Sequence, residues 1–300
     1  MCKMMRDALL RTGIASASCA LLVPQRARAY EQKPPASRVI LIRHGESEGN
    51  VNFDIYRSTP DARIHLTKKG WTQAHEAGRL LGAMLGDSAR VRVVCSPYVR
   101  TRETLSGVTA GWDRLRHAPT AIEPRVAEMD VAGGLTMEDA TFRHANVQSR
   151  SNPYFFRWPN GESWADLERR TLDYCKADGL LGPCASAAPA AHEAETPETV
   201  VIVTHALAAM TLMRSLCGAS PDIEDVCMRR CLKNCELVEL VRGEKGLRLV
   251  RRIVPSHDGS APRDTRISPQ DEWYEHFPLR LPCEDAPTLR QIARTSPPSP

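Results

Sequence analysis

The chain has 300 residues, of which 42% are hydrophobic and 25% are charged, with a formal net charge of +4 at pH 7. This composition is typical of a globular protein large enough to bury a sizeable core without disulfides. Lys and Arg form no dense block, which argues against nucleic acid as a partner, and no run of about 18 apolar residues predicts a membrane span.

The first 36 residues differ in composition from the rest of the chain. Asp7 is the only acid before Glu31, while Lys and Arg recur through the segment. Two interpretations stay open: a disordered tail, or a targeting segment in the form of an organelle presequence or a weak signal peptide. We expect a cytoplasmic protein, and a presequence would make the mitochondrion the alternative location.

Short apolar runs rich in β-branched residues indicate buried strands at 38–43, 91–95 and 200–203. They alternate with segments in which apolar residues recur at helical spacing. These predicted helices run from the turn at 66–70 to residue 85, from Ser96-Pro97 onward, over 162–176 and through 207–216. The alternation predicts an α/β protein, a three-layer αβα sandwich around a mostly parallel central sheet.

The remaining segments bound the predicted domain. Residues 235–241 and 247–253 predict a hairpin. Residues 184–199 are rich in Ala, Pro, Ser and Glu and indicate a flexible insertion. We therefore predict a disordered or targeting segment at 1–36, one domain at 37–254 and a Pro-rich extension at 255–300.

The ten cysteines include no Cys-x-x-Cys pair. Cys227, Cys231 and Cys235 recur at intervals of four, but Cys235 lies in a run that alternates like a strand rather than a helix. We interpret the cysteines as buried free thiols. The histidines show no metal-ligand spacing either, so we predict neither a metal site nor a cofactor.

Polar groups follow three of the predicted strands directly. These groups are Arg43-His44, Ser96 and His205, and ligands of parallel α/β sheets bind outside the carboxyl ends of the strands. The imidazole of His44 can accept a phosphoryl group, and the planar fork of Arg100 suits phosphoryl oxygens. Three separate segments of the chain are therefore expected to direct polar groups to one rim of the sheet.

Two smaller residues complete the candidate site. Gly45 would let the backbone approach a ligand closely, and Asn50 offers a side-chain amide to the same oxygens. A phosphate monoester carries two negative charges near neutral pH, and transfer of its phosphoryl group needs a nucleophile, cations and a proton source.

The candidate residues belong to motifs that occur in a recognisable order over residues 38–241. These motifs are Arg43-His44-Gly45-Glu46-Ser47 with Asn50, Leu66-Thr67 with Gly70 and Gln73-Ala74, Ser96 with Arg100 and Thr104, Glu128, Gly161-Glu162-Ser163, and Thr204-His205. With them the chain resembles the histidine phosphatase, or phosphoglycerate mutase-like, superfamily. Within that superfamily it is most similar to the broad-range acid phosphatase type.

The resemblance implies a phosphoglycerate mutase-like fold and a role for each residue of the site. It implies that His44 becomes transiently phosphorylated and that Arg43, Arg100 and His205 surround the phosphate. It also implies that Glu128 donates a proton to the leaving group and later acts as the base for water. No metal or other cofactor takes part in this scheme.

The chain departs from the family pattern in two places. Val131-Ala132-Gly133-Gly134 stands where an aromatic residue with Gly-Asn is expected, and Ala206 replaces the usual glycine after the second histidine. The first change would alter the rim that meets the substrate, whereas the second is small. Asp130 is the second choice for the acid.

We therefore predict a metal-independent phosphatase that hydrolyses phosphate monoesters through a phosphohistidine. Its partner would be a small phosphorylated substrate or a phosphoprotein, and nothing in the sequence specifies an oligomeric state. Two alternatives stay open: a phosphoglycerate mutase-type phosphotransferase, and a catalytically weak relative that acts as a scaffold or binding protein.

Overall fold

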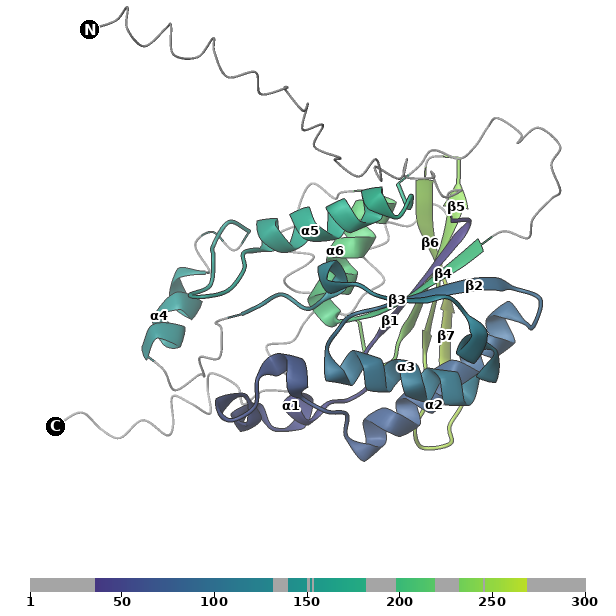
Figure 1. Ribbon diagram of the computed structural model, residues 1–300, viewed down its shortest axis with the longest axis horizontal. Helices are drawn as coiled ribbons and strands as arrows, with labels where there is room; N and C mark the ends of the chain where they lie inside the picture. Colours follow the sequence, from purple (N-terminus) through teal and green to yellow (C-terminus); the bar gives the residue numbers. More distant parts are fainter. Residues whose placement is uncertain are drawn as a thin grey trace, which may run out of the picture. The chain divides into compact units, whose positions relative to one another are not determined.

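Figure 1 shows the computed structural model, which describes residues 36–131, 140–149, 152, 154–181, 198–218, 232–244 and 246–268. Several predictions fall outside the described residues: the N-terminal segment up to residue 35, residues 184–197 of the insertion, the departures at 132–134, Cys227, Cys231 and the extension beyond residue 268. The four described cysteines are free thiols; Cys95, Cys175 and Cys235 are buried as predicted, whereas Cys217 is only partly buried.

The central element is a seven-stranded sheet with the order β3-β2-β4-β1-β5-β6-β7. Its strands are β1 (Arg38–Arg43), β2 (Arg90–Cys95), β3 (Thr120–Ile122), β4 (Glu198–Thr204), β5 (Leu237–Gly243), β6 (Gly246–Val254) and β7 (Arg263–Arg266). Strands β1 to β4 pair in parallel, and β5, β6 and β7 extend the sheet with antiparallel pairs. Only β5 and β7 oppose the common strand direction in the described chain, which confirms the mostly parallel α/β sheet and the hairpin.

Helices lie on both faces of this sheet (Figure 1). They are α1 (Glu48–Val51), α2 (Lys68–Leu85), α3 (Val99–Gly111), α4 (Ala140–Gln148), α5 (Trp164–Ala177) and α6 (Ala206–Cys217), with the short 3-10 helices η1 (Phe53–Arg57), η2 (Asp61–Arg63), η3 (Asp113–His117) and η4 (Pro124–Val126). Helices α2 and α3 cover one face, and α5 and α6 cover the other.

Alternate side chains of β1 enter two separate hydrophobic cores. Val39 and Leu41 belong to the core that includes residues of α5 and α6, whereas Ile40 and Ile42 belong to the core that includes residues of α2 and α3. All four side chains are fully buried. A strand covered on both sides needs an unbroken apolar run, which is why β1 was recognisable without periodic alternation.

The structure corrects three details of the sequence interpretation. Strand β4 begins at Glu198, inside the range 184–199 predicted as an insertion. Cys235, predicted within a strand, precedes β5 and has a φ of 54°, a left-handed conformation that cannot continue a strand. Strands β3 and β7 were not predicted because every residue in them is exposed, so they lack the apolar signal of a buried strand.

Helices α2 and α3 approach each other at glycines. A Cβ atom placed on Gly78 of α2 would lie 2.1 Å from the carbonyl oxygen of Val108 in α3, which is closer than two non-bonded atoms can approach. The same contact holds from the other side, because a Cβ on Gly111 would lie 2.1 Å from the carbonyl oxygen of His75. The fixed backbone of each helix therefore requires glycine on its neighbour.

We expect Gly78→Ala to lower the free energy of unfolding by roughly 2 kcal/mol. Overpacking against rigid backbone costs up to about 3 kcal/mol, which exceeds the gain of about 1 kcal/mol in helix propensity. Urea denaturation measures the change, and Arg79→Ala at the exposed neighbouring position is the control. A Gly78→Ala protein as stable as the wild type would contradict the close approach.

Candidate active site

The parallel register aligns the carboxyl ends of three neighbouring strands. Arg43 pairs with Thr204 and Cys95 pairs with Val203, so β1, β4 and β2 end at the same edge of the sheet. The backbone amide of His44 donates to the carbonyl of Thr204 at 2.9 Å. The ring centroids of His44 and His205 consequently lie 5.2 Å apart, with the rings tilted by 60°.

His44 has one ring nitrogen occupied and is almost completely buried. Its Nδ1 lies 2.7 Å from the carbonyl oxygen of Gly45. Because a carbonyl only accepts, the neutral ring carries its proton on Nδ1 and keeps a lone pair on Nε2. Burial, followed by the charges of Arg100 and Arg43, holds the pKa of His44 well below its ordinary value of 6.5. The ring is therefore neutral, with an unprotonated Nε2, beside two cations.

His205 is completely buried next to it. Its Nε2 lies 2.8 Å from the hydroxyl oxygen of Ser96, and the ring of Tyr98 meets it edge-on at 4.9 Å between centroids. Within the described part of the chain, its Nδ1 has no hydrogen-bond partner. Burial and the nearby Arg100 keep its pKa well below 6.5. A buried ring nitrogen without a partner is suited to an oxygen of a bound ligand.

The two arginines of the site are also buried. Arg43 donates from Nη1 to the carbonyl of Leu232 at 2.7 Å. Arg100 donates from Nη1 to both the carbonyl and Oδ1 of Asp61 at 2.7 Å, and from Nη2 to Oδ2 at 3.3 Å. Its guanidinium carbon lies 4.9 Å from the centre of the Tyr98 ring. Arg100 thus already binds an oxyanion in a forked arrangement, the geometry that it would offer to phosphate.

Asp61 was not recognised from the sequence. It begins the short helix η2 directly after Pro60, and its partner Arg100 lies 39 residues further along the chain, so no local pattern could have revealed the pair. The Asp61 side chain is 34% exposed, whereas that of Arg100 is 5% exposed. Burial and the charge of Asp61 raise the pKa of Tyr56 to about 12, so the phenol stays neutral beside this pair.

Glu128 reaches the helix that begins after His205. Its Oε2 accepts from the backbone amide of Leu207 at 3.2 Å, and its Oε1 accepts from the amides of Ala208 at 3.2 Å and Met129 at 3.0 Å. The carboxylate therefore caps the first turn of α6, where the helix dipole favours negative charge. This contact brings the predicted acid to the same edge of the sheet as the histidines.

Asp130, the second choice for the acid, is exposed, and its backbone amide donates to Glu162 Oε2 at 3.1 Å.

Two other residues near the site were missed by the sequence interpretation. Tyr98 contacts both His205 and Arg100, and Arg170 of α5 contacts the backbone around Glu128. Only the position of Tyr98 just beyond the end of β2 could have signalled it.

Gly45 has a structural reason to be glycine. A Cβ atom at this position would lie 2.5 Å from the carbonyl oxygen of Gly70, at the start of α2. Its backbone amide donates to the hydroxyl of Thr104 at 3.0 Å. The close approach that this glycine permits is thus to α2, and its predicted contact with a ligand stays a prediction.

Asn50 ties together the loops around His44. Its Oδ1 accepts from the backbone amide of Ser47 at 3.1 Å and from Nδ2 of Asn234 at 3.2 Å. The same Asn234 amide group donates to the carbonyl of His44 at 3.0 Å. Since Oδ1 is occupied, the predicted contact between Asn50 and a substrate would use its amide nitrogen.

Among the described residues, no group of three or more His, Cys, Asp or Glu side chains is arranged to hold a metal ion. None of the helices in these ranges is both long enough and apolar enough to cross a membrane.

Comparison with known proteins supports the resemblance seen in the motifs. The model of the histidine phosphatase superfamily (branch 1) matches residues 39–254. The phosphoglycerate mutase-like protein AT74H of Arabidopsis thaliana is 37% identical over 155 residues, which cover 49% of this chain and 55% of the relative. An acid phosphatase of Mycobacterium tuberculosis is 36% identical over 86 residues, covering 25% of this chain and 40% of that protein. The chain thus spans about half the length of the curated relatives it matches.

Solved structures share the fold at lower identity. The alpha-ribazole phosphatase of Shigella flexneri has a TM-score of 0.52 at 21% identity and covers 73% of this chain and 96% of its own. The mycobacterial glucosyl-3-phosphoglycerate phosphatase in complex with VO3 also has a TM-score of 0.52 at 21% identity. The match covers 71% of this chain and 96% of that protein. These similarities confirm the phosphoglycerate mutase-like α/β architecture.

We expect Asp61→Asn to tighten the binding of inorganic phosphate roughly fivefold, equivalent to about 1 kcal/mol. The substitution removes the negative charge that competes for Arg100. Isothermal titration calorimetry measures the dissociation constant. Asp54→Asn is the control, because Asp54 forms an exposed ion pair with Arg57 on neighbouring η1. Unchanged or weaker binding in Asp61→Asn would show that the two anions do not compete.

Proposed function

Because this chain belongs to the histidine phosphatase superfamily (branch 1), we propose that it is a phosphatase that hydrolyses phosphate monoesters through a phosphohistidine at His44. One observation carries the proposal. The neutral imidazole of His44 has Nδ1 engaged by the Gly45 carbonyl and Nε2 left with its lone pair, beside the charges of Arg43 and Arg100. A nucleophile and the cations that neutralise a phosphoryl group thus occupy one buried site.

In the first step, Nε2 of His44 attacks phosphorus in line with the leaving oxygen. The N–P bond forms while the P–O bond breaks, and its electron pair passes to the leaving oxygen. Glu128 in its protonated form donates the proton that makes this oxygen an alcohol. Arg43 and Arg100 donate hydrogen bonds to the phosphoryl oxygens, and Nδ1 of His205 is the buried group with the capacity to add another.

In the second step, water replaces the imidazole. The Glu128 carboxylate removes a proton from water as its oxygen attacks phosphorus, and the N–P bond breaks. Inorganic phosphate leaves, His44 returns to the neutral state, and Glu128 is again protonated for the next cycle. The net reaction converts a phosphate monoester and water into an alcohol and inorganic phosphate, with no oxidant, reductant or cofactor.

Arginines supply the positive charge in this scheme, so we propose that the reaction needs no metal ion. We further propose a small phosphorylated molecule as substrate, with a phosphoprotein as the alternative to be compared in the same assay. Support comes from the similar structures, which are described as phosphatases of alpha-ribazole and of glucosyl-3-phosphoglycerate.

We expect His44→Ala to lower phosphate release more than about 1,000-fold, because the covalent step loses its nucleophile. A malachite green assay on a panel of phosphate monoesters measures the loss. His75→Ala, at an exposed histidine of α2, is the matched control. Activity of the wild type should be indifferent to a chelator.

Two outcomes would overturn the proposed function. One is phosphate release by His44→Ala at the wild-type rate. The other is interconversion of phosphoglycerates by the wild type without release of phosphate, which would favour the mutase alternative suggested by the phosphoglycerate mutase-like relatives.

We expect the acidic limb of the kcat/KM profile to lie below pH 6.5. Only neutral His44 attacks, and its lowered pKa keeps the ring neutral as the pH falls through 6.5. Removal of one neighbouring cation in Arg100→Gln should raise that pKa, so the limb should move to higher pH. Arg102→Gln, at an exposed position of α3, should leave the limb unchanged. A limb that moves to lower pH in Arg100→Gln would refute this assignment.

A further inference from the structure

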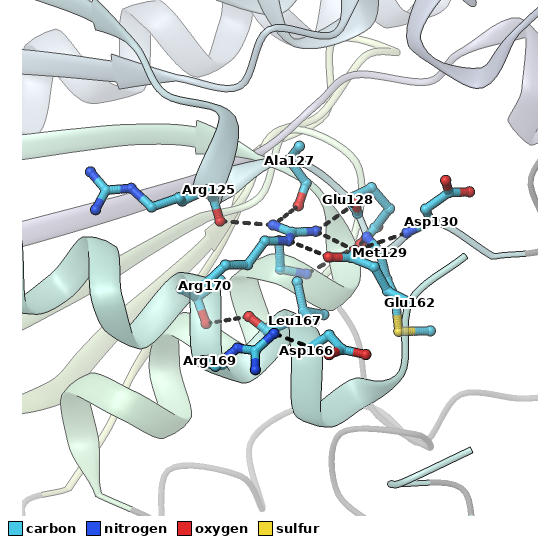
Figure 2. A network of polar contacts seen from close by, with 12 residues as sticks. Arg125, Ala127, Glu128, Met129, Asp130, Glu162, Asp166, Leu167, Arg169 and Arg170 are labelled. Carbon is cyan, nitrogen blue, oxygen red and sulfur yellow. Dashed lines mark hydrogen bonds and ion pairs between the residues drawn. The ribbon is translucent and has the colours of Figure 1, made fainter. Parts of the chain in front are cut away.

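Arg170 of α5 contacts the acid segment, which we define as residues 125–130 around Glu128. Its Nη1 donates to the carbonyls of Arg125 at 2.8 Å and Ala127 at 2.9 Å. Its Nη2 donates to the carbonyl of Glu128 at 2.8 Å. Figure 2 shows the guanidinium reaching from the helix into this stretch of backbone. The side chain is only 20% exposed, so water competes little for these contacts.

Glu162 completes the arrangement. Its two carboxylate oxygens accept from Nε and Nη2 of Arg170, each at 2.8 Å. Its Oε2 also accepts from the amide of Asp130, and its own amide donates to the Asp130 carbonyl at 2.8 Å. The Arg170–Glu162 pair therefore holds the acid segment on both sides of Glu128 (Figure 2).

The acid segment has little regular structure of its own. Beyond η4 it forms neither helix nor strand, so most of its carbonyls depend on side chains for hydrogen bonds. The carbonyl of Val126 accepts from the hydroxyl of Thr204 at 2.6 Å, and the carbonyls of 125, 127 and 128 all accept from Arg170. One guanidinium thus holds three of the six carbonyls of the acid segment, including that of Glu128 itself.

We propose that Arg170 is a positioning residue that sets the place of the Glu128 carboxyl group relative to the leaving oxygen. This inference rests on the proposed function, in which Glu128 is the proton donor. A planar guanidinium offers five N–H donors from three nitrogens, and here all three nitrogens are used. Lysine has its donors on a single nitrogen and could not span the same set of acceptors.

The leaving group of the substrate provides the test. Nitrophenolate departs without a proton, whereas the alkoxide of an alkyl phosphate requires one from Glu128. The parameter kcat/KM reports the steps through departure of the leaving group, so it isolates the step in which Glu128 acts as an acid. A displaced Glu128 should therefore lower kcat/KM for an alkyl phosphate far more than for nitrophenyl phosphate.

We expect Arg170→Gln to lower kcat/KM roughly 10- to 100-fold for an alkyl phosphate and less than about threefold for nitrophenyl phosphate. Glu128→Gln should show the same selectivity. Arg170→Lys, which keeps the charge and serves if the Gln variant fails to fold, should give a smaller loss of the same kind. Arg169→Gln is the matched control, because that neighbouring side chain is 76% exposed and pairs with Asp166 instead.

A second readout does not depend on activity. Hydrogen exchange should show faster exchange in residues 125–130 and in the first turn of α6 in Arg170→Gln, and not in Arg169→Gln. An equal loss on both substrates, or unchanged exchange in these segments, would overturn the positioning role. If the wild type hydrolysed neither substrate, the proposed function would fail, while exchange would still decide whether Arg170 holds the acid segment.

Discussion

The constraint on which this structure depends is the burial of a neutral imidazole beside two guanidinium groups. His44 stays uncharged because water is excluded and because Arg43 and Arg100 oppose a further positive charge. Buried arginines are costly unless each has an acceptor. The fold meets that requirement with the carbonyl of Leu232 for Arg43 and with Asp61 for Arg100. Each of these acceptors comes from a part of the chain far from its arginine.

The sheet positions the side chains of the site, and the loops supply their hydrogen-bond partners. Parallel strands of matched register end together, so residues directly after β1, β2 and β4 meet without any further device. The backbone contact between Gly45 and the start of α2 then fixes the loop after His44. The two helices on that face approach each other closely at glycines, and α3 carries Arg100.

The sequence was most informative where a single local pattern determines the outcome. Strands covered by helices on both faces show short apolar runs rich in β-branched residues, so β1, β2 and β4 were predictable, and the residues after them followed. Asp61 and Arg170 were not predictable, because each acts through contacts with residues about 40 positions away in the sequence. Strands β3 and β7 were not predicted for a different reason, because their exposed residues carry no apolar pattern. The proposed catalytic roles rest on side-chain chemistry and on the family resemblance, and not on periodicity.

The contact between Glu128 and helix α6 has a consequence beyond the position of one carboxyl group. The amides of Leu207 and Ala208 donate hydrogen bonds to a fully charged carboxylate only while Glu128 is ionised. Each gain of a proton by Glu128 would weaken both contacts and leave the end of the helix dipole less well compensated. In the proposed mechanism, the backbone amide hydrogens of these two residues would therefore report spectroscopically whether Glu128 holds the transferred proton.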